Sequence, residues 1–367
     1  MSRKTIALIL IILCTALLFS SCIIKDDNAD RPTKKPIVAP TPTPVPTAFR
    51  EYPETIIQWM IPFGAGTDID NWNRAIGDGL ADQLGWRIMY TNISGGLSGS
   101  TGTYKVFNSR HDGYMYAGAS ERTLTIPIYV EGELTTKDWV YFIAGGAPSV
   151  LCVSPNIGLE TIQEFVMAAD NAEEDNELTI AVSGGGLQAA LPYYFVTESG
   201  LPFNLKTYKT DEEAREACKN AEVDAVIAPA NMVAYDVSKK RLLPLAVMDD
   251  KDLTNHSFYR NSIPSIRTTI PTIKPEALEA LRQFRGFCLP ADTPKQILLA
   301  IEEGFLELDD NAGFNEFINS VYGNVYLYTG EKAEEHVSSA ERYLNWILSD
   351  MNKGGYTPDY VDIERPY

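Results

Sequence analysis

The chain has 367 residues, of which 45% are apolar, and its formal net charge is −18 at pH 7. This length and apolar content suffice for a substantial core and favour two domains over one. So acidic a chain repels nucleic acid and anionic lipid headgroups, and no dense stripe of Lys and Arg interrupts it, so nucleic-acid binding is not expected.

The first 21 residues are typical of a lipoprotein signal peptide. Arg3 and Lys4 precede the apolar run Ile6–Phe19, which is shorter than the roughly 20 residues needed to span a membrane. The run ends in FSSC, whose small residues before Cys22 resemble the lipobox of bacterial lipoproteins. The resemblance implies cleavage before Cys22 and attachment of lipid to its sulfur. The alternative is an ordinary secretory signal followed by an incidental cysteine.

Residues 22–50 have a different composition, in which charged residues are followed by alternating Pro and Thr. Such a sequence cannot bury enough apolar surface to fold alone. We expect a lipid-anchored tether, in which Lys25–Arg50, extended as polyproline II at about 3.1 Å per residue, holds the rest of the chain up to roughly 80 Å from the membrane.

The cysteines form no metal or redox motif. Cys14 is expected to leave with the signal, and the lipobox resemblance implies that Cys22 is the lipid attachment site. Cys152, Cys218 and Cys288 remain, far apart and without CxxC or Cys/His spacing. We predict three small buried side chains, and a disulfide between two of them is the alternative.

From residue 51 onward, strand-like runs alternate with helical ones, which indicates an α/β protein with largely parallel sheets. A helix is expected over Asn71–Leu84, whose apolar residues recur at four-residue steps, with Asp70 as its N-cap. The expected strands are, in chain order, Thr55–Ile61, Arg87–Tyr90, Tyr114–Ala119, Phe142–Gly146, Val150–Pro155, Leu178–Val182, Leu205–Lys209, Val223–Pro229 and Leu242–Met248.

Three glycine-rich turns fall where such sheets bind ligands, at the carboxyl ends of strands. They are GAGTDID (Gly64–Asp70), GGLSGSTG (Gly95–Gly102) and SGGGLQ (Ser183–Gln188). A turn before a helix N-terminus offers backbone N–H groups and the positive end of the helix dipole to an anion. The first turn also carries acid, at Asp68 and Asp70, which is unusual in an anion site. The alternative for any one turn is that its glycines only permit positive φ.

In their order, these stretches resemble the extracytoplasmic receptors of tripartite tricarboxylate transporters, the Bug or TctC family. Tyr52–Gly85 is similar to the family pattern YPxKPIxxxVPFxPGGGTDxxARxxAxxLxxxLG, and His111–Ser120 to PDGYTLLLGS. Ala181–Phe195, Tyr208–Val233 and Phe284–Leu298 follow in the family's order, the last resembling WFGLxAPAGTPxxIV. The similarity covers about residues 52–346, and the chain is identified as a divergent, lipoprotein-form member.

This resemblance implies a two-domain type II periplasmic-binding-protein clamshell, in which the chain crosses between the domains twice. The crossings are expected near Ser149–Ser154 and Ala246–Asp250. Domain 1 would comprise residues 51–149 and 250–367, and domain 2 residues 150–249. The tail, residues 352–367, lies beyond the resemblance and is expected to pack on domain 1 or to fray.

The resemblance also implies a function. The receptor would capture a small carboxylate-containing metabolite, an organic acid or an amino acid, between its domains and deliver it to the permease subunits of a tripartite tricarboxylate-type transporter. It would lie outside the cytoplasm, anchored to the bacterial cell membrane through Cys22, with no cofactor or metal. The alternative is a surface lipoprotein with a structural or adhesive role and a degenerate ligand site.

An enzyme is not expected, and no catalytic residue is assigned. Ser183–Gly186 lacks the G-x-S-x-G elbow of hydrolases. The three histidines, His111, His256 and His336, stand in no recognisable Ser/His/Asp order. Clustered metal ligands and a phosphate-loop lysine are also missing from the sequence.

The residues expected to bind the ligand lie in the first and third glycine turns, after the expected strand Tyr114–Ala119, and after the expected strand Val223–Pro229. They are Phe63, Gly64, Ala65, Gly66, Thr67, Asp68, Ser120, Arg122, Ser183, Gly184, Gly185, Gly186, Leu187, Gln188 and Asn231.

Three departures from the family pattern bear on the ligand. Asp68 replaces a glycine, Leu187 a hydroxyl residue and Ala190 a histidine. A carboxylate at Asp68 would repel an anionic ligand unless it is paired, and Arg122 or a cationic group on the ligand could pair it; exposure at the loop rim is the alternative. We therefore expect a ligand with one carboxylate and an amine or apolar part, rather than a citrate-like compound.

Overall fold

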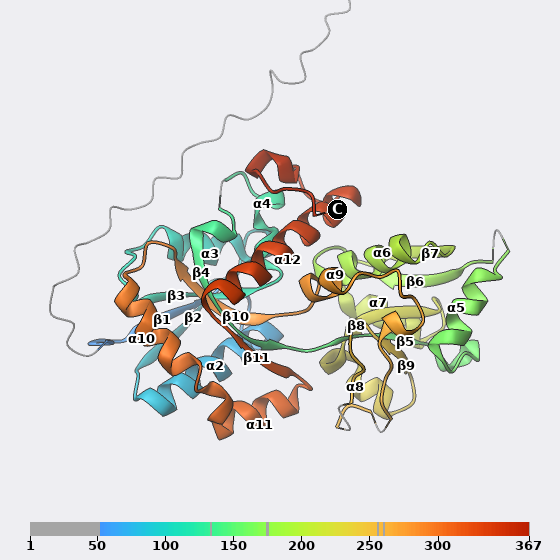
Figure 1. Cartoon of the computed structure of the whole chain (residues 1–367), viewed down its shortest axis with the longest axis horizontal. Helices are drawn as coiled ribbons and strands as arrows, with labels where there is room; N and C mark the ends of the chain where they lie inside the picture. Colours follow the sequence, from blue (N-terminus) through green and yellow to red (C-terminus); the bar gives the residue numbers. More distant parts are fainter. Residues whose placement is uncertain (1–51, 133, 174–175, 255–256, 260, 367) are drawn as a thin grey trace, which may run out of the picture. The chain divides into compact units, whose positions relative to one another are not determined.

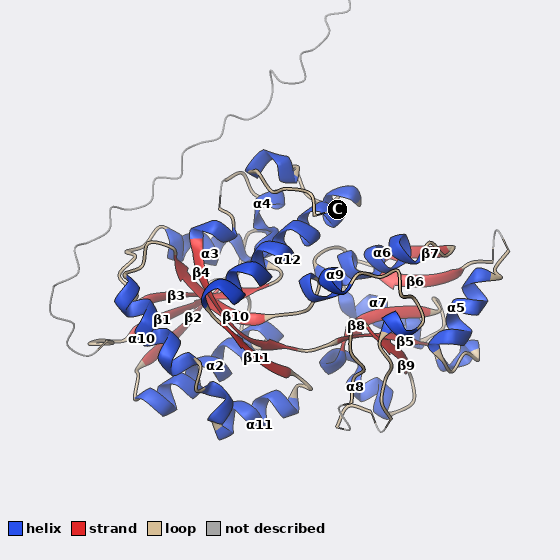
Figure 2. Ribbon diagram, in the orientation of Figure 1, coloured by secondary structure: helices blue, strands red, loops and turns tan. Residues whose placement is uncertain are grey.

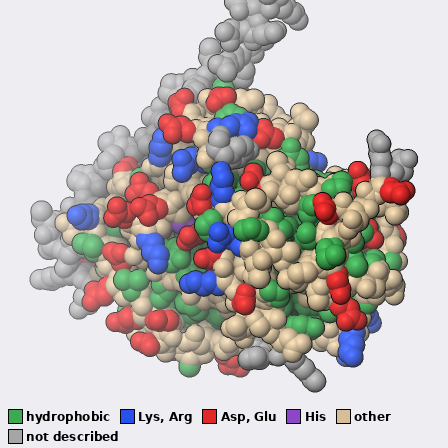
Figure 3. Space-filling model, turned by 45° about the vertical axis from the view of Figure 1, so that its right-hand side comes forward, with side chains coloured by type: hydrophobic (Ala, Val, Ile, Leu, Met, Phe, Trp, Pro, Cys, Tyr) green, Lys and Arg blue, Asp and Glu red, His purple; other side chains and the backbone are tan. Residues whose placement is uncertain are grey.

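The computed structural model describes residues 52–132, 134–173, 176–254, 257–259 and 261–366. The expected signal, the tether and Cys22 lie outside the described residues. Within them, no helix is both long enough and apolar enough to span a bilayer. Acidic side chains are spread over the face in Figure 3, with Lys and Arg among them.

The first sheet has six strands in the order β11-β4-β10-β3-β1-β2 (Figures 1 and 2). They are β1 (Ile57–Ile61), β2 (Ile88–Asn92), β3 (Met115–Ser120), β4 (Trp139–Gly146), β10 (Arg285–Pro290) and β11 (Asn324–Tyr328). Alternate residues of each strand face opposite sides. Trp59 therefore joins one apolar cluster and Met60 another.

Helices cover both faces of this sheet. The Trp59 cluster contains residues of α2 (Asp68–Leu84), α10 (Lys295–Phe305) and α11 (Ala312–Ser320). The Met60 cluster contains residues of α3 (Ser100–Phe107) and of the first half of α12 (Gly330–Asp350).

The second sheet has five strands in the order β7-β6-β8-β5-β9. They are β5 (Ser149–Val153), β6 (Leu178–Val182), β7 (Phe203–Thr207), β8 (Ala225–Pro229) and β9 (Leu243–Val247). One apolar cluster joins this sheet to α5 (Ile162–Asp170), α6 (Leu187–Ser199) and α9 (Pro275–Ala280). Another joins it to α7 (Asp211–Lys219) and α8 (Ala230–Ser238).

Short helices complete the described chain. They are α4 (Ile126–Tyr129) and the 3₁₀ segments η1 (Leu97–Gly99), η2 (Thr123–Thr125), η3 (Thr136–Asp138), η4 (Pro155–Ile157), η5 (Ile266–Thr268), η6 (Leu308–Asp310) and η7 (Pro358–Val361).

The α/β class is confirmed, but both sheets are mixed rather than largely parallel. β1 pairs in parallel with β2 and β3, and β6 with β7 and β8. β10 pairs antiparallel with β3 and β4, and β5 with β8 and β9. β5 and β10, the strands with these antiparallel pairings, are the first strands after the two passages of the chain between the sheets. β10 and β11 were not expected from the sequence.

The chain passes between the sheets twice. β4 of the first sheet ends at Gly146, and β5 of the second begins at Ser149. On the return, Leu281 still packs in a cluster of the second sheet, whereas Phe284 packs in a cluster of the first. Most of the segment between β9 and β10 therefore packs with the second sheet.

α12 packs with both sheets. Val337 and Ala340 lie in the Met60 cluster, whereas Leu344 and Leu348 lie in the cluster that contains α6 and α9. The tail folds back on this helix, because Trp346 Nε1 donates to the carbonyl of Ile363 at 3.0 Å. The tail is therefore packed.

The three cysteines of the body, Cys152, Cys218 and Cys288, are free and buried. This confirms that they are small core residues and excludes a disulfide among them. Burial raises the pKa of Cys288 above its usual value, so its thiol is neutral.

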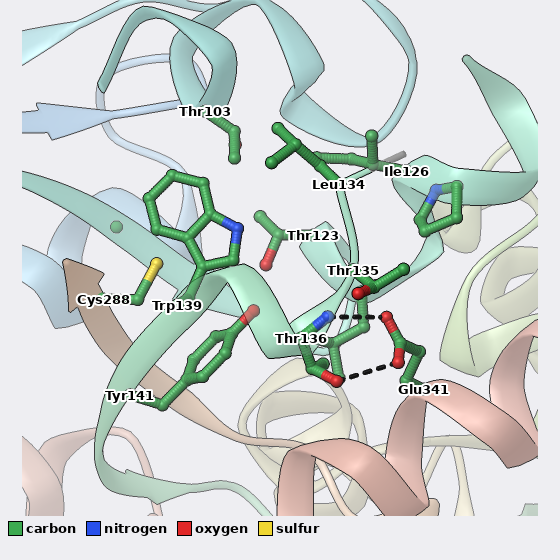
Figure 4. Close-up of a pocket in the computed structure, with 13 residues that line it drawn as sticks. Thr103, Thr123, Ile126, Leu134, Thr135, Thr136, Trp139, Tyr141, Cys288 and Glu341 are labelled. Atoms are coloured by element: carbon green, nitrogen blue, oxygen red, sulfur yellow. Dashed lines mark hydrogen bonds between the residues drawn. The ribbon is translucent and has the colours of Figure 1, made fainter. Parts of the chain in front are cut away.

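Glu341 of α12 is a carboxyl buried beside η3 (Figure 4). Its Oε1 accepts from the Thr136 N–H at 2.9 Å, and its Oε2 lies 2.8 Å from the Thr136 hydroxyl. Burial raises the pKa of Glu341 to about 7, in spite of these hydrogen bonds. A cavity of about 20 Å³, lined also by Trp139 and Tyr141, adjoins the carboxyl.

We predict that Glu341→Gln stabilises the protein at neutral pH. The amide keeps both hydrogen bonds to Thr136 and cannot ionise. The native fold holds this proton up to about pH 7, whereas the unfolded chain releases it near about pH 4.3. The native free energy of unfolding therefore falls as pH rises between these values. By urea denaturation, the variant should gain on the order of 2–4 kcal/mol over native between about pH 4 and pH 8.

Glu303→Gln, at an exposed position of α10, is the matched control and should show no such pH-dependent gain. A constant difference between Glu341→Gln and native protein across this range would contradict a raised pKa of Glu341.

Candidate functional site

The three glycine turns follow the carboxyl ends of strands. They join β1 to α2, β2 to η1 and α3, and β6 to α6. β1 and β2 are parallel neighbours, so the first two turns meet at one edge of the six-stranded sheet. A Cβ added to Gly99 would lie 3.0 Å from Phe63 Cζ, so the second turn covers Phe63.

The first turn is closed by its own hydrogen bonds. Thr67 is the N-cap of α2, and its Oγ1 accepts from the Asp70 N–H at 3.4 Å. Asp70 Oδ2 accepts from the Gly66 N–H at 2.8 Å, and its Oδ1 from Arg74 Nε at 2.9 Å. The expectation that Asp70 is the N-cap is therefore wrong, because α2 already begins at Asp68. Burial acts to raise the pKa of Asp70, but its hydrogen bonds, that of Arg74 first, hold it below the usual value.

The remaining donors of this turn lie at the start of α2. The Thr67 N–H donates to the carbonyl of Gly64 at 3.3 Å, so it is already bonded within the turn. The N–H groups of Asp68 and Ile69 are in the first turn of a helix, where no intrahelical acceptor exists. These two N–H groups are the donors of this turn that are left for an anion.

The third turn leads into α6 through Gly186, whose φ of +68° places it in the region that favours glycine. Gly186 is the N-cap and makes no side-chain capping bond, so the N–H groups of Leu187 and Gln188 have no cap. The Leu187 side chain is 2% exposed and Ala190 is 0% exposed, both within the apolar cluster. The two side chains that depart from the family pattern therefore pack in the core.

Arg285 pairs Asp68. Its Nε and Nη2 donate to Asp68 Oδ2 at 2.9 and 2.8 Å, and its Nη1 donates to Glu121 Oε2 at 2.5 Å. We call these three residues the Arg285 cluster. The expected pairing of Asp68 with Arg122 is wrong, because β10 brings Arg285 beside the end of β3 and the start of α2.

The Arg285 cluster is buried and acidic on balance. Arg285 is 3% exposed and Glu121 is 4% exposed. Burial acts to lower the pKa of Arg285, but Glu121 and Asp68 raise it above its usual value. Because two carboxylates face one guanidinium, one excess negative charge remains.

Asn231 links the Arg285 cluster to the second sheet. It is the second residue of α8, which follows β8 directly. Its Nδ2 donates to Asp68 Oδ1 at 2.8 Å. The two oxygens of Asp68 therefore bond in different directions, one to a residue of the six-stranded sheet and the other to a helix of the five-stranded sheet.

Arg122 and Tyr129 lie against the third turn. A Cβ on Gly186 would lie 3.8 Å from Arg122 Nη2, and one on Gly185 would lie 3.4 Å from Tyr129 Oη. Arg122 Nη2 also lies 4.0 Å from Asp211 Oδ2 at the start of α7. The segment after β3 therefore contacts the turn after β6.

Three buried polar atoms beside these turns have no hydrogen-bond partner within the described part of the chain. They are Ser120 Oγ at the end of β3, Asn231 Oδ1, and Tyr208 Oη. Tyr208 adjoins the third turn, because its carbonyl would lie 3.8 Å from a Cβ on Gly184. Since proteins bond nearly all buried polar atoms, these three are candidates for contact with a bound molecule.

The structure brings most of the expected residues into two facing groups. The first turn, Ser120 and Arg122 belong to the six-stranded sheet, and the third turn and Asn231 belong to the five-stranded sheet. Leu187 is the exception, since its side chain is in the core and only its N–H is placed to bind.

Sequence reasoning missed Glu121, Tyr129 and Arg285. A signal for Arg285 existed, because the family pattern WFGL has an apolar residue where FRGF has arginine. Asp68 departs from the same pattern with the opposite charge, and the two departures together predict an ion pair. Tyr129 gave no signal, since a tyrosine in the apolar run IPIY is typical of a core.

Comparison with known proteins identifies the family of the chain. Residues 73–341 match the model of the tripartite tricarboxylate transporter family receptor. Protein BugT of Bordetella pertussis is 26% identical over 217 residues, which are 58% of this chain and 65% of BugT, just under two thirds of that relative.

Solved structures with the same fold include three that are similar over almost their whole length. A TctC solute binding protein from Polaromonas has a TM-score of 0.68 and 19% identity, covering 82% of this chain and 100% of that one. Rpa4515 of R. palustris with adipate has a TM-score of 0.64 and 16% identity, covering 83% and 99%. The periplasmic binding protein BugD has a TM-score of 0.59 and 16% identity, covering 83% of this chain and 99% of that one.

The family model covers more than half of the chain, and the fold agrees with it. The chain therefore belongs to the family of tripartite tricarboxylate transporter receptors.

Proposed function

We propose that the chain is an extracytoplasmic receptor that binds a small carboxylate solute between the first and third glycine turns. The observation that carries this proposal is the pair of helix N-termini, of α2 and α6, whose turns come from different sheets and are linked by Asp68 and Asn231. Both ends offer N–H groups to an anion. Among proteins with the same fold, Rpa4515 has adipate bound and MatC of Rhodopseudomonas palustris has malate bound, which supports a carboxylate.

We propose a role for each group of site residues. The backbone N–H groups at the starts of α2 and α6 hold a carboxylate, and the guanidinium of Arg122 adds a positive charge beside Gly186. Phe63, Ser120 and Gln188 would contact the rest of the solute. Asn231 Oδ1 would accept a hydrogen bond from it. No catalytic step, cofactor or metal is part of the proposal.

The charge of the Arg285 cluster limits the solute. Arg285 offsets only one of its two acids, so a second carboxylate near Asp68 meets an excess negative charge. The partnerless Asn231 Oδ1 is an acceptor, which an amine or hydroxyl satisfies and a carboxylate does not. We therefore propose an organic acid or amino acid with one carboxylate and a donor group.

We propose two domains that meet at this site, one on each sheet. The first boundary lies at residues 147–148, close to the expected position at 149/150. The packing of Leu253, Ile263 and Leu281 with the clusters of the five-stranded sheet supports a second boundary at residues 282–284 instead of 249/250. A solute held by both domains closes them about these two passages.

We propose that the receptor delivers its solute to a tripartite tricarboxylate-type permease in the membrane. The signal-like first 21 residues, FSSC before Cys22 and the Pro/Thr-rich residues 22–50 support a lipid anchor and tether outside the cytoplasm.

We predict that the native protein binds a monocarboxylate with an amine or hydroxyl at least about tenfold more tightly than succinate or citrate, because each unmatched polar group costs about 1–3 kcal/mol. Titration calorimetry with alanine, glutamate, lactate, succinate and citrate measures this. Asn231→Ala should weaken binding, whereas Asn204→Ala, exposed on β7, should not. Tightest binding of citrate would contradict the proposed selectivity. Binding of no solute would favour a structural or adhesive lipoprotein.

We predict that Cys22→Ala moves the protein from the membrane fraction to the soluble fraction, because the variant has no sulfur to carry lipid. Fractionation followed by immunoblotting measures this, and Cys288→Ala, which removes a buried cysteine of the body, is the control. Retention of the Cys22→Ala protein in the membrane fraction would show that another element anchors it.

A further inference from the structure

We propose that the Asp68 carboxylate replaces a solute carboxylate as the link between the two domains. Held by Arg285 on one side and by Asn231 on the other, it favours the closed arrangement without any solute. The link itself is independent of the proposed function; only its consequence for solute choice rests on it.

The first support is the geometry of Asp68. Its Oδ2 accepts hydrogen bonds from Arg285 Nε and Nη2 at 2.9 and 2.8 Å, and its Oδ1 accepts one from Asn231 Nδ2 at 2.8 Å. A bound carboxylate that closes two domains makes the same kind of contact, a charged group on one side and a neutral donor on the other. Here the carboxylate belongs to the chain.

The second support is that the groups on either side are fixed. Arg285 is in β10, and its Nη1 also donates to Glu121 Oε2 at 2.5 Å and to the carbonyl of Phe284 at 2.7 Å, hydrogen bonds that do not involve Asp68. Asn231 is in the first turn of α8, directly after a central strand of its sheet. Removing the Asp68 side chain therefore leaves Arg285 and Asn231 facing a space that a free carboxylate fits.

The third support is the low exposure of the contact. The Asp68 side chain is 16% exposed and that of Arg285 is 4% exposed, so water competes poorly for their hydrogen bonds. Between the domains, the ion pair of Arg122 with Asp211 has its charged atoms 4.0 Å apart, and its side chains are more exposed, at 43% and 28%. Such an exposed pair contributes little.

The link has a consequence for the solute. Asp68 already supplies the carboxylate that links Arg285 to Asn231. The solute therefore needs only one carboxylate, which the helix N-termini bind. Removing the Asp68 carboxylate opens a place for a second carboxylate, so Asp68→Ala should bind succinate at least about tenfold more tightly than the native protein does.

Chemical rescue tests the link. Met89 and Met167 are 49% and 63% exposed. Spin labels attached at Met89→Cys and Met167→Cys report the distance between the domains by pulsed electron paramagnetic resonance. The protein is unfolded, dialysed and refolded to remove retained solute. The native chain should give one short distance, and Asp68→Ala should give a longer one, with the closed-to-open ratio lowered at least about tenfold. Formate or acetate should restore the short distance in Asp68→Ala, and acetamide should not.

Two variants complete the design. Asn231→Ala should also open the domains, but acetate should not rescue it, because the missing group is a donor. Asp211→Ala, which removes the exposed ion pair, should leave the distance unchanged. An unchanged distance in both Asp68→Ala and Asn231→Ala, or equal rescue by acetate and acetamide, would overturn the proposal. The distances measured before formate or acetate is added involve no solute, so a failure of the proposed function in calorimetry is seen separately.

Discussion

The organisation of the site depends on a guanidinium in the protein interior. A buried charge is tolerated only when it is paired and hydrogen-bonded. Arg285 meets this requirement through Glu121 and Asp68. Asp68 can therefore lie in a turn built for anions, because its charge is directed at Arg285. Removing one partner of such a pair typically costs about 3–5 kcal/mol, so the three residues constrain one another.

The parts of the site are positioned by different elements of the fold. Strand ends place the turns, helix starts supply the N–H groups, and β10 brings Arg285 to them after the chain returns from the second sheet. The tail contributes as well. The N–H groups of Gly355 and Tyr356 donate to the carbonyl of Ile128 at 2.8 and 3.0 Å, which holds α4 and thus Tyr129 against the third turn.

Much of this fold could be predicted from the sequence. The nine expected strands are present, because alternating apolar runs and glycine turns mark them locally. β10 was missed because a charged residue interrupts its apolar pattern, whereas β11 is as long as β1 and its length gave no reason to miss it. The helix was expected to begin at Asn71, but α2 begins at Asp68. Thr67 and Asp70 are both plausible N-caps, and only the hydrogen bonds distinguish them.

The candidate site was less predictable than the fold. The positions of the turns followed from motif and order, whereas the partner of Asp68 lies 217 residues away in sequence. The one signal for such a distant contact was that both positions depart from the family patterns with opposite charges. Leu187 and Ala190 were interpreted as changes in the binding surface, but α6 turns both side chains into the core. When a helix begins in a ligand-binding turn, the sequence alone does not show which side chains of its first residues face the ligand.

The most direct measurement of the central claim is native mass spectrometry of the full chain, freshly purified from its own cells. The account predicts a mass excess equal to one small acid, which dissociates on gentle activation and can be identified by its fragments. A bare chain mass, both before and after incubation with mixed small organic acids and amino acids, would contradict the claim that the two glycine turns bind a solute.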